Sequence, residues 1–248
     1  MRYLISFSYD GSCFDGFQKQ NSKKTVQGEL EKALSELEEK QVKIHASGRT
    51  DKGVHAKDQK AHFDLDKNVK LYNLKKYLNR KFSGEIYVND IKEVDNNFHA
   101  RYNVKSKTYT YYINTKEFNP IKRNYIYQYC NDLDIESMKK ASGCLIGKHD
   151  FKSFCSDSSK ENTIRTITSI DIKEKEGVIS ITFTGDGFLR KMIRNIVAIL
   201  IEIGSNKKDI SYMKEMLDNK VRTGNLKCAN PEGLYLEKVK YWSFFIFL

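Results

Sequence analysis

The stretch YLISFSY, residues 3–9, carries an apolar or aromatic side chain at every second position. Alternate side chains of an extended chain point to opposite faces, so this pattern predicts a β-strand that is buried on one face. Apolar residues then recur at helical spacing over residues 26–37, after Thr25, a residue type that caps helix N-termini. We predict a strand followed by an amphipathic helix with Glu and Lys on its solvent face. The buried face of the strand holds Tyr3, Ile5, Phe7 and Tyr9.

The same periodicities divide the chain into two similar halves. Residues 1–102 give the order β-α-β-β-α-β, with later elements at 42–45, 60–65, 71–80 and 85–94. Residues 103–248 repeat that order, with elements at 108–114, 134–147, 163–173, 178–185, 188–204, 208–218 and 234–242. This predicts an α+β fold of two RRM or ferredoxin-like halves that form a mixed, mainly antiparallel sheet with helices on one face. We expect a catalytic cleft between the halves.

The composition is strongly basic. The 248 residues include 43 Lys and Arg against 32 Asp and Glu, a net charge of +11, and both halves carry the surplus. A positive charge spread over folded segments suits a surface that follows a phosphate backbone. A lysine-rich solvated surface would give the same composition, so charge alone leaves both interpretations open.

Other features of the chain indicate a cytoplasmic location. The five cysteines are an odd number without a CxxC pair, as expected for reduced thiols rather than a disulfide framework or a zinc site. The N-terminal sequence lacks the charged, apolar and small-residue regions of a signal peptide. The longest apolar runs, such as residues 196–201, are much shorter than the roughly 20 residues of a membrane-spanning helix. We therefore expect a cytoplasmic protein without a membrane span.

The loop SGRTDKGVHA, residues 47–56, is too polar to belong to the core. Gly48 and Gly53 favour a tight turn that would hold Asp51 at its tip. An arginine nearby, such as Arg49, would keep this carboxylate ionised and oriented, as a nucleophile or a base requires. A turn cap at Asp51 and a solvated Arg49 are the simpler alternative.

Two further stretches carry candidate site residues. In TGDGFLRKMIRNIVAIL, residues 184–200, Arg190 and Arg194 are four positions apart and are predicted on one face of a helix that its apolar residues seat in the core. In KSKTYTYYI, residues 105–113, Tyr109 shares a strand face with Tyr111 and could stack on an unpaired base. A surface arginine pair and core tyrosines are the alternatives.

Five motifs in succession resemble those of the TruA family of tRNA pseudouridine synthases. They are ASGRTDKGVHA, FHARYNVKSKTYTYYI, GKHDFKSF, GDGFLRKMIRNIVAIL and PEGLYL. The opening YLISFSYDGSCFDGFQKQ is similar to that family's first strand and loop. The resemblance therefore extends over nearly the whole chain, from residue 3 to about residue 241.

The resemblance implies an isomerase that converts uridine to pseudouridine at positions 38, 39 and 40 in the anticodon stem-loop of tRNA. It implies no cofactor and no metal, and a homodimer with the tRNA spanning both subunits. The motif positions imply Asp51, Tyr109 and Arg194 as catalytic residues. The residues implied in substrate binding are Arg49, Arg101, Arg190 and Leu234.

Two departures from the family pattern and three rival interpretations accompany this resemblance. KSKT, before Tyr109, has less arginine than expected, and WSFFIFL, residues 242–248, is unusually apolar for the end of such a chain. The rivals are the same chemistry on another RNA site, a non-catalytic RNA-binding protein, and a metal-dependent nuclease built on His55, Asp58 and His62. Strand alternation already explains His62, and no third histidine or cysteine joins this group in the sequence.

Overall fold

The structure is a computed structural model that describes residues 1–157, 159, 161–220 and 228–242. The chain forms two compact units. The first joins residues 1–107 to the chain from Tyr235 onward, and the second comprises residues 108–234. The division expected after residue 102 counts the residues from Tyr235 onward with the second half, and these contact units count them with the first.

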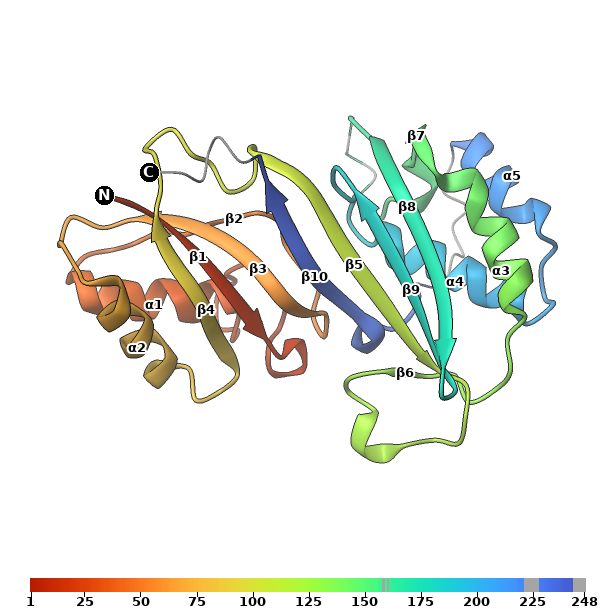
Figure 1. Cartoon of the computed structure of the whole chain (residues 1–248), viewed down its shortest axis with the longest axis horizontal. Helices are drawn as coiled ribbons and strands as arrows, with labels where there is room; N and C mark the ends of the chain where they lie inside the picture. The colour runs from red at the N-terminus through yellow and green to blue at the C-terminus, as the bar shows by residue number, and fades with distance from the viewer. Residues whose placement is uncertain (158, 160, 221–227, 243–248) are drawn as a thin grey trace. The chain divides into compact units, whose positions relative to one another are not determined.

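The described residues of the first unit form a mixed set of strands and two α-helices (Figure 1). Its strands follow the spatial order β4-β1-β3-β10, and the short β2 pairs with β3. β1 is antiparallel to β3 and to β4, whereas β10 is parallel to β3. The elements are β1 (Arg2–Tyr9), α1 (Val26–Glu38), β2 (His45–Ala46), β3 (His55–Asp64), α2 (Leu71–Lys81), β4 (Ile86–Glu93) and β10 (Leu234–Tyr241).

The core of the first unit confirms the alternation predicted for residues 3–9. Tyr3, Ile5 and Phe7 are buried, and α1 crosses behind the strands in Figure 1. Thr25 caps α1, since its hydroxyl accepts a hydrogen bond from the backbone N–H of Gly28. Burying these side chains removes apolar surface from water, which is the main favourable contribution to folding.

The solvent face predicted for α1 is only partly correct, because Glu31 and Glu38 are buried. Glu31 accepts hydrogen bonds from Gln27 and from the backbone N–H of Ile44. Glu38 accepts from two backbone N–H groups just after β3. These carboxylates tie the helix to the loops beside it, a role that amphipathic spacing does not reveal.

The second unit places its strands in the order β5-β9-β8-β7, with β6 beside β5. β8 is antiparallel to both β7 and β9, and β6 is parallel to β5. The strands and helices confirm the predicted α+β class with mixed, mainly antiparallel pairing. The elements are β5 (Val104–Asn114), β6 (Tyr127–Gln128), α3 (Ile135–Ser142), β7 (Gly147–Asp150), β8 (Ile164–Lys175), β9 (Val178–Gly185), α4 (Met192–Gly204) and α5 (Ser211–Asn219).

Several predicted boundaries are corrected. β3 begins at His55 rather than at residue 60, and α3 ends at Ser142 with a 3-10 turn after it. The helix predicted from residue 188 begins at Met192, because Lys191 has a left-handed backbone (φ +60°) that no α-helix continues through. The 3-10 segments are Gly11–Cys13, Pro120–Lys122, Gly143–Leu145, Lys152–Phe154 and Pro231–Gly233.

Two expectations concern the chain's end and the membrane. Of WSFFIFL, only Trp242 is described and it is exposed; residues 243–248 lie outside the described residues. No helix in the described part of the chain is long and apolar enough to cross a membrane.

Candidate active site

The loop of residues 47–54 holds Asp51 in a tight turn that leads into β3. The backbone N–H of Val54 donates to the Asp51 carbonyl at 3.2 Å. Gly53 has φ +80°, a conformation that L side chains rarely adopt, so glycine is the residue this turn requires. The turn leaves the Asp51 side chain partly exposed.

Thr50, the residue before Asp51, is fixed from two sides. Its hydroxyl lies 2.8 Å from the hydroxyl of Tyr9, and its carbonyl accepts a hydrogen bond of 3.1 Å from the backbone N–H of Phe17. Tyr9 is buried, and burial raises its pKa to about 12, so its hydroxyl stays protonated at neutral pH. The backbone that carries Asp51 is thus tied to β1 and to the loop before α1.

The start of the same loop is fixed by β3 and β5. Gln59 is buried; its amide accepts from the Ser47 hydroxyl at 2.7 Å and donates to the Gly48 carbonyl at 3.1 Å. The Lys107 ammonium donates to the Ser47 carbonyl at 2.6 Å. A Cβ on Gly48 would lie 2.8 Å from this ammonium. Together these bonds leave the loop little freedom to move as a whole.

Gly11 packs against the backbone of Val54 at the end of the Asp51 loop. A Cβ at Gly11 would lie 2.1 Å from the Val54 carbonyl oxygen, so only glycine lets the two backbones approach this closely. The Gly11 N–H also donates to Nδ1 of His55 at 3.1 Å. Gly11 therefore supports the Asp51 loop, although it lies about forty residues earlier in the sequence.

In the second unit, Arg194 lies in the first turn of α4 and is anchored to a distant segment. Its Nε donates to the Ala229 carbonyl at 2.7 Å, and the Ala229 N–H donates to the Arg194 carbonyl at 3.1 Å. The Tyr111 hydroxyl donates to the Asn230 carbonyl at 2.8 Å. A Cβ on Gly233 would lie 2.7 Å from the Tyr111 ring. The unit thus brings together β5, the start of α4 and the PEGLYL motif.

Tyr109 lies on the same face of β5 as Tyr111 and is buried. Its ring meets Phe188 edge to face, with centroids 5.4 Å apart and an interplanar angle of 83°. This arrangement fixes the ring plane through the favoured contact of a ring edge with a ring face. The predicted strand face of Tyr109 and Tyr111 is confirmed, while Phe188 lies before α4 rather than within it.

The other predicted site residues are distributed over both units. Arg49 is exposed in the Asp51 loop, and Arg101 is exposed beside the Tyr102 ring at 6.0 Å. Leu234 is buried at the start of β10. Arg190 is exposed and precedes α4, so the prediction that Arg190 and Arg194 share a helix face is wrong; the left-handed residue Lys191 separates them.

The residues considered for a metal-dependent nuclease, His55, Asp58 and His62, form hydrogen bonds within the first unit. Nδ1 of His62 accepts from the Ala100 N–H at 3.1 Å, as that of His55 does from Gly11. Asp58 accepts from Ser6 and from the Lys60 ammonium. Burial lowers the pKa of His62 to about 4, so it is neutral at pH 7. Across the described ranges, no group of three His, Cys, Asp or Glu residues is arranged to hold a metal ion.

The sequence interpretation missed the residues that hold the candidate site in place. The sequence pattern places Tyr9 on a strand face and Gln59 just before a strand. Neither pattern indicates that these residues form hydrogen bonds with the Asp51 loop. Asn195 is buried in α4 and donates to the Phe154 carbonyl at 2.8 Å. The available signal is a polar residue inside an apolar helix pattern, which in a folded protein calls for a hydrogen-bond partner.

Comparison with known proteins identifies the family. The family model described as tRNA pseudouridine synthase matches residues 5–103 and 141–242. The chain is 42% identical over 238 residues to tRNA pseudouridine synthase A of Mycoplasmoides gallisepticum, covering 96% of this chain and 90% of that protein. It is 41% identical over 247 residues to tRNA pseudouridine synthase A of Limosilactobacillus reuteri, covering 97% and 96%.

A third relative, tRNA pseudouridine synthase A 2 of Bacillus cereus, is 38% identical over 242 residues, covering 96% of this chain and 99% of that protein. Among solved structures, a match to a crystal structure of a Cbf5-Nop10-Gar1 complex covers 80% of this chain and 45% of that chain at 12% identity, with a TM-score of 0.33. The matched ranges and the identities along nearly the full length agree with the motif order. This chain belongs to the tRNA pseudouridine synthase family.

Proposed function

We propose that this protein isomerises uridine to pseudouridine in the anticodon stem-loop of tRNA, at positions 38, 39 and 40. The observation that carries the proposal is Asp51, in a GRTD motif, at the tip of a loop that hydrogen bonds hold at both ends. Membership of the family and curated relatives named tRNA pseudouridine synthase A support the same reaction.

The chemistry requires a fixed carboxylate. The uridine must leave its base stack, its N-glycosidic bond must break, and the uracil must turn and rejoin the sugar through carbon 5, which then loses a proton. Asp51 acts as the nucleophile, or as the base that begins elimination. A carboxylate already in position avoids the cost of ordering the loop during the reaction.

Tyr109 and Arg194 act with Asp51 on the same uridine. Arg194 supplies the positive charge that acts with the aspartate in the reaction. Its anchoring to Ala229 supports this role, because a guanidinium with a fixed Nε presents its remaining donors in one direction. Tyr109 stacks on the uracil and receives the carbon 5 proton directly or through water; its ring plane is set by Phe188.

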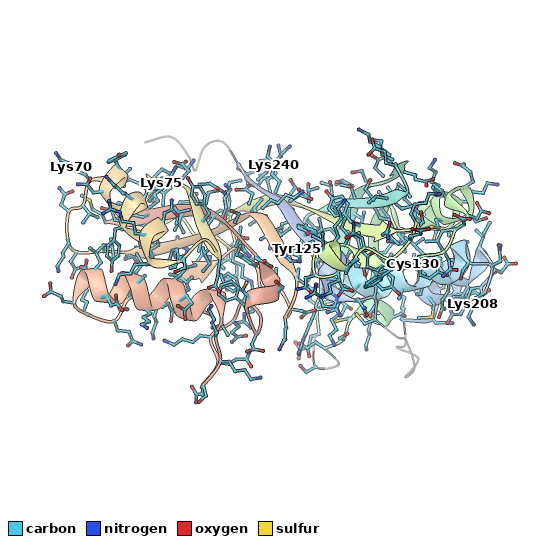
Figure 2. The ribbon with its side chains drawn as sticks, turned by 90° about the horizontal axis from the view of Figure 1, so that it is seen from below. Lys70, Lys75, Tyr125, Cys130, Lys208 and Lys240 are labelled. Atoms are coloured by element: carbon cyan, nitrogen blue, oxygen red, sulfur yellow. The ribbon has the colours of Figure 1, made fainter. Side chains whose placement is uncertain are left out.

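The proposed binding residues surround this chemistry. Leu234 packs under the uracil and keeps water from the intermediate. Arg49 displaces the base or pairs with phosphate, and Arg101 and Arg190 bind the RNA backbone. Lysines that project from each unit supply further positive charge, including the labelled Lys70, Lys75 and Lys240 in the first unit and Lys208 in the second (Figure 2).

We also propose a homodimer whose two subunits share the tRNA, and a cytoplasmic location. Relatives of nearly equal length support the assignment of the whole activity to this chain, since it covers 90% to 99% of them. The tRNA substrate supports the cytoplasm as the place where the enzyme works.

The reaction is tested by release of tritium from tRNA whose uridines are labelled at carbon 5. The wild-type protein should release tritium, and Asp51→Asn should release none above background. Asp66→Asn is the matched control, because Asp66 is an exposed acid of the same unit whose partner is Lys40. Release by Asp51→Asn at the wild-type rate, or no release by the wild type, contradicts the proposal; the second result, with binding retained, favours a non-catalytic RNA-binding protein.

A further inference from the structure

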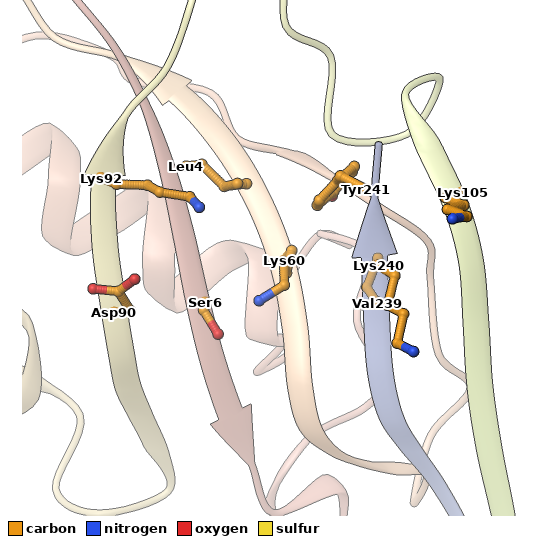
Figure 3. A pocket seen from close by; sticks show the side chains of 9 residues that line it. All are labelled: Leu4, Ser6, Lys60, Asp90, Lys92, Lys105, Val239, Lys240 and Tyr241. Atoms are coloured by element: carbon orange, nitrogen blue, oxygen red, sulfur yellow. The ribbon is translucent and has the colours of Figure 1, made fainter. Parts of the chain in front are cut away.

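The first unit has a hollow of about 300 Å³ on the sheet face opposite Tyr3, Ile5 and Phe7 of β1 (Figure 3). In this view the labelled side chains lie on the near side of the strands, with helical ribbon behind. None of the lining residues belongs to the Asp51 loop. They are Leu4, Ser6, Lys60, Asp90, Lys92, Lys105, Val239, Lys240 and Tyr241.

The hollow carries excess positive charge. Four of its lining residues are lysines and one is an aspartate. Lys60 is compensated by Asp58, outside the lining, at 2.8 Å. Within the described part of the chain, no ion pair compensates Lys92, Lys105 or Lys240, which leaves three lysines against Asp90. Burial, together with the charge of Lys60, lowers the pKa of Lys92, while Asp90 raises it.

The floor of the hollow is apolar and firmly held. Leu4, Val239 and Tyr241 are buried there, and the Tyr241 hydroxyl donates to the Ala100 carbonyl at 2.7 Å. Asp58, the ion-pair partner of Lys60, also accepts a hydrogen bond from the Ser6 hydroxyl at 2.6 Å. Lysines above an apolar floor attract anions more strongly than lysines surrounded by water, because the local dielectric constant is lower.

An exposed aromatic ring borders the lysines. Trp242 is 45% exposed, and the Lys105 ammonium lies 4.7 Å from its ring centroid. Cations beside an aromatic ring match both parts of a nucleotide, since the lysines attract the phosphates and the ring offers a face on which a base can stack. A small inorganic anion would use only the lysines.

We propose that this lysine hollow binds the phosphodiester backbone of tRNA at a segment other than the nucleotide that is modified. The inference rests on the proposed function for the identity of the RNA. Lys92, Lys105 and Lys240 pair with successive phosphates, and Trp242 stacks on a neighbouring base. The contact adds affinity without taking part in the reaction, so it acts on KM rather than on kcat.

The test is the salt dependence of tRNA binding by the full chain, measured by filter binding between 50 and 300 mM KCl. The double variant Lys92→Gln/Lys240→Gln should lower the slope of log Kd against log salt by about 2, because each lysine–phosphate contact contributes about 1. Lys92→Arg/Lys240→Arg keeps both charges and should retain the slope. Lys32→Gln/Lys43→Gln removes two exposed charges of the same unit outside the hollow and should leave the slope near the wild-type value.

The same variants are assayed for tritium release and for oligomeric state by light scattering. The proposal predicts a raised KM for tRNA with unchanged kcat in Lys92→Gln/Lys240→Gln. An unchanged slope in that variant overturns the proposal, and a changed oligomeric state with unchanged slope shows a protein interface instead. A lowered slope without tritium release by the wild type supports RNA binding in the hollow while contradicting the proposed reaction, so the two failures are distinguishable.

Discussion

The hydroxyl of Tyr9 lies 2.8 Å from the hydroxyl of Thr50, the residue immediately before Asp51. This contact joins the first strand of the chain to the loop that carries the proposed catalytic carboxylate. Since Tyr9 is buried and its pKa is raised to about 12, the hydrogen bond persists throughout the pH range in which proteins are stable. The residue that precedes Asp51 is thus tied to a side chain of β1.

Tyr9→Phe removes this hydrogen bond while keeping the ring in the core. We expect the free energy of unfolding to fall by about 1 kcal/mol and kcat to fall by about 10- to 100-fold, because a displaced carboxylate reacts poorly. Tyr77→Phe is the control, since the Tyr77 hydroxyl donates to the Ala33 carbonyl in α1, away from the loop. It should lose similar stability and retain kcat; an equal loss of kcat in both variants contradicts the role given to Tyr9.

Gly11→Ala tests the close approach of the N-terminal loop to Val54. The added Cβ would lie 2.1 Å from a carbonyl oxygen, so we expect a loss of about 1–3 kcal/mol in the free energy of unfolding and a fall in kcat. Gly143→Ala has open space around the new Cβ and should change stability by less than about 0.5 kcal/mol. Urea denaturation and tritium release measure both effects, and wild-type activity in Gly11→Ala argues against the contact.

Arg194→Lys separates charge from position. Lysine keeps the positive charge but lacks the planar guanidinium whose Nε bonds to Ala229, so we expect kcat to fall about 100-fold. Arg123→Lys, in an exposed loop where the guanidinium bonds only locally, is the control and should retain kcat. Steady-state kinetics on tRNA measure kcat for each variant. A wild-type kcat in Arg194→Lys would mean that the positive charge alone supports the reaction.

His62 makes stability depend on pH. Burial, Arg2, His99 and His45 lower its pKa to about 4, while Asp64 raises it. Between pH 6.5 and 4 the unfolded chain therefore binds more protons than the folded one. The free energy of unfolding contributed by His62 falls as the pH is lowered through that window.

The loss from His62 is at most about 3.5 kcal/mol, because its pKa falls from 6.5 to about 4 and each pKa unit corresponds to about 1.4 kcal/mol. Urea denaturation at pH 7 and pH 4.5 should show a smaller difference for His62→Gln than for the wild type. An identical difference in both proteins means that His62 is not the group responsible.

Much of the fold follows from local patterns, and the errors have physical causes. Tyr3, Ile5 and Phe7 are buried as their alternation predicts, since period 2 matches a strand on one face. The start of α4 is missed because Phe188 and Leu189 fit the helical period, while the left-handed turn at Lys191 has no sequence signal as strong as a glycine. The parallel pairing of β10 with β3 joins residues far apart in the chain, which no local period encodes.

In the candidate site, too, local features can be predicted from the sequence and tertiary contacts cannot. Asp51 and its turn are predictable, because a polar loop with two glycines contains all the information needed. The bonds from Tyr9 and Gln59 to this loop, and from Arg194 to Ala229, depend on tertiary packing and appear only in the folded chain. Sequence motifs therefore predict the turn around Asp51 better than the residues that hold it in place.

We propose Asp51 as the carboxylate of a pseudouridine synthase acting on the anticodon stem-loop. The most direct measurement is pseudouridine mapping, by chemical adduct formation and primer extension, on total tRNA treated with the purified wild-type protein and, in parallel, with Asp51→Ala. We predict new stops at positions 38 to 40 with the wild type only. Stops of equal strength with Asp51→Ala, or no stops on any tRNA from a wild-type protein that still binds RNA, would contradict the claim.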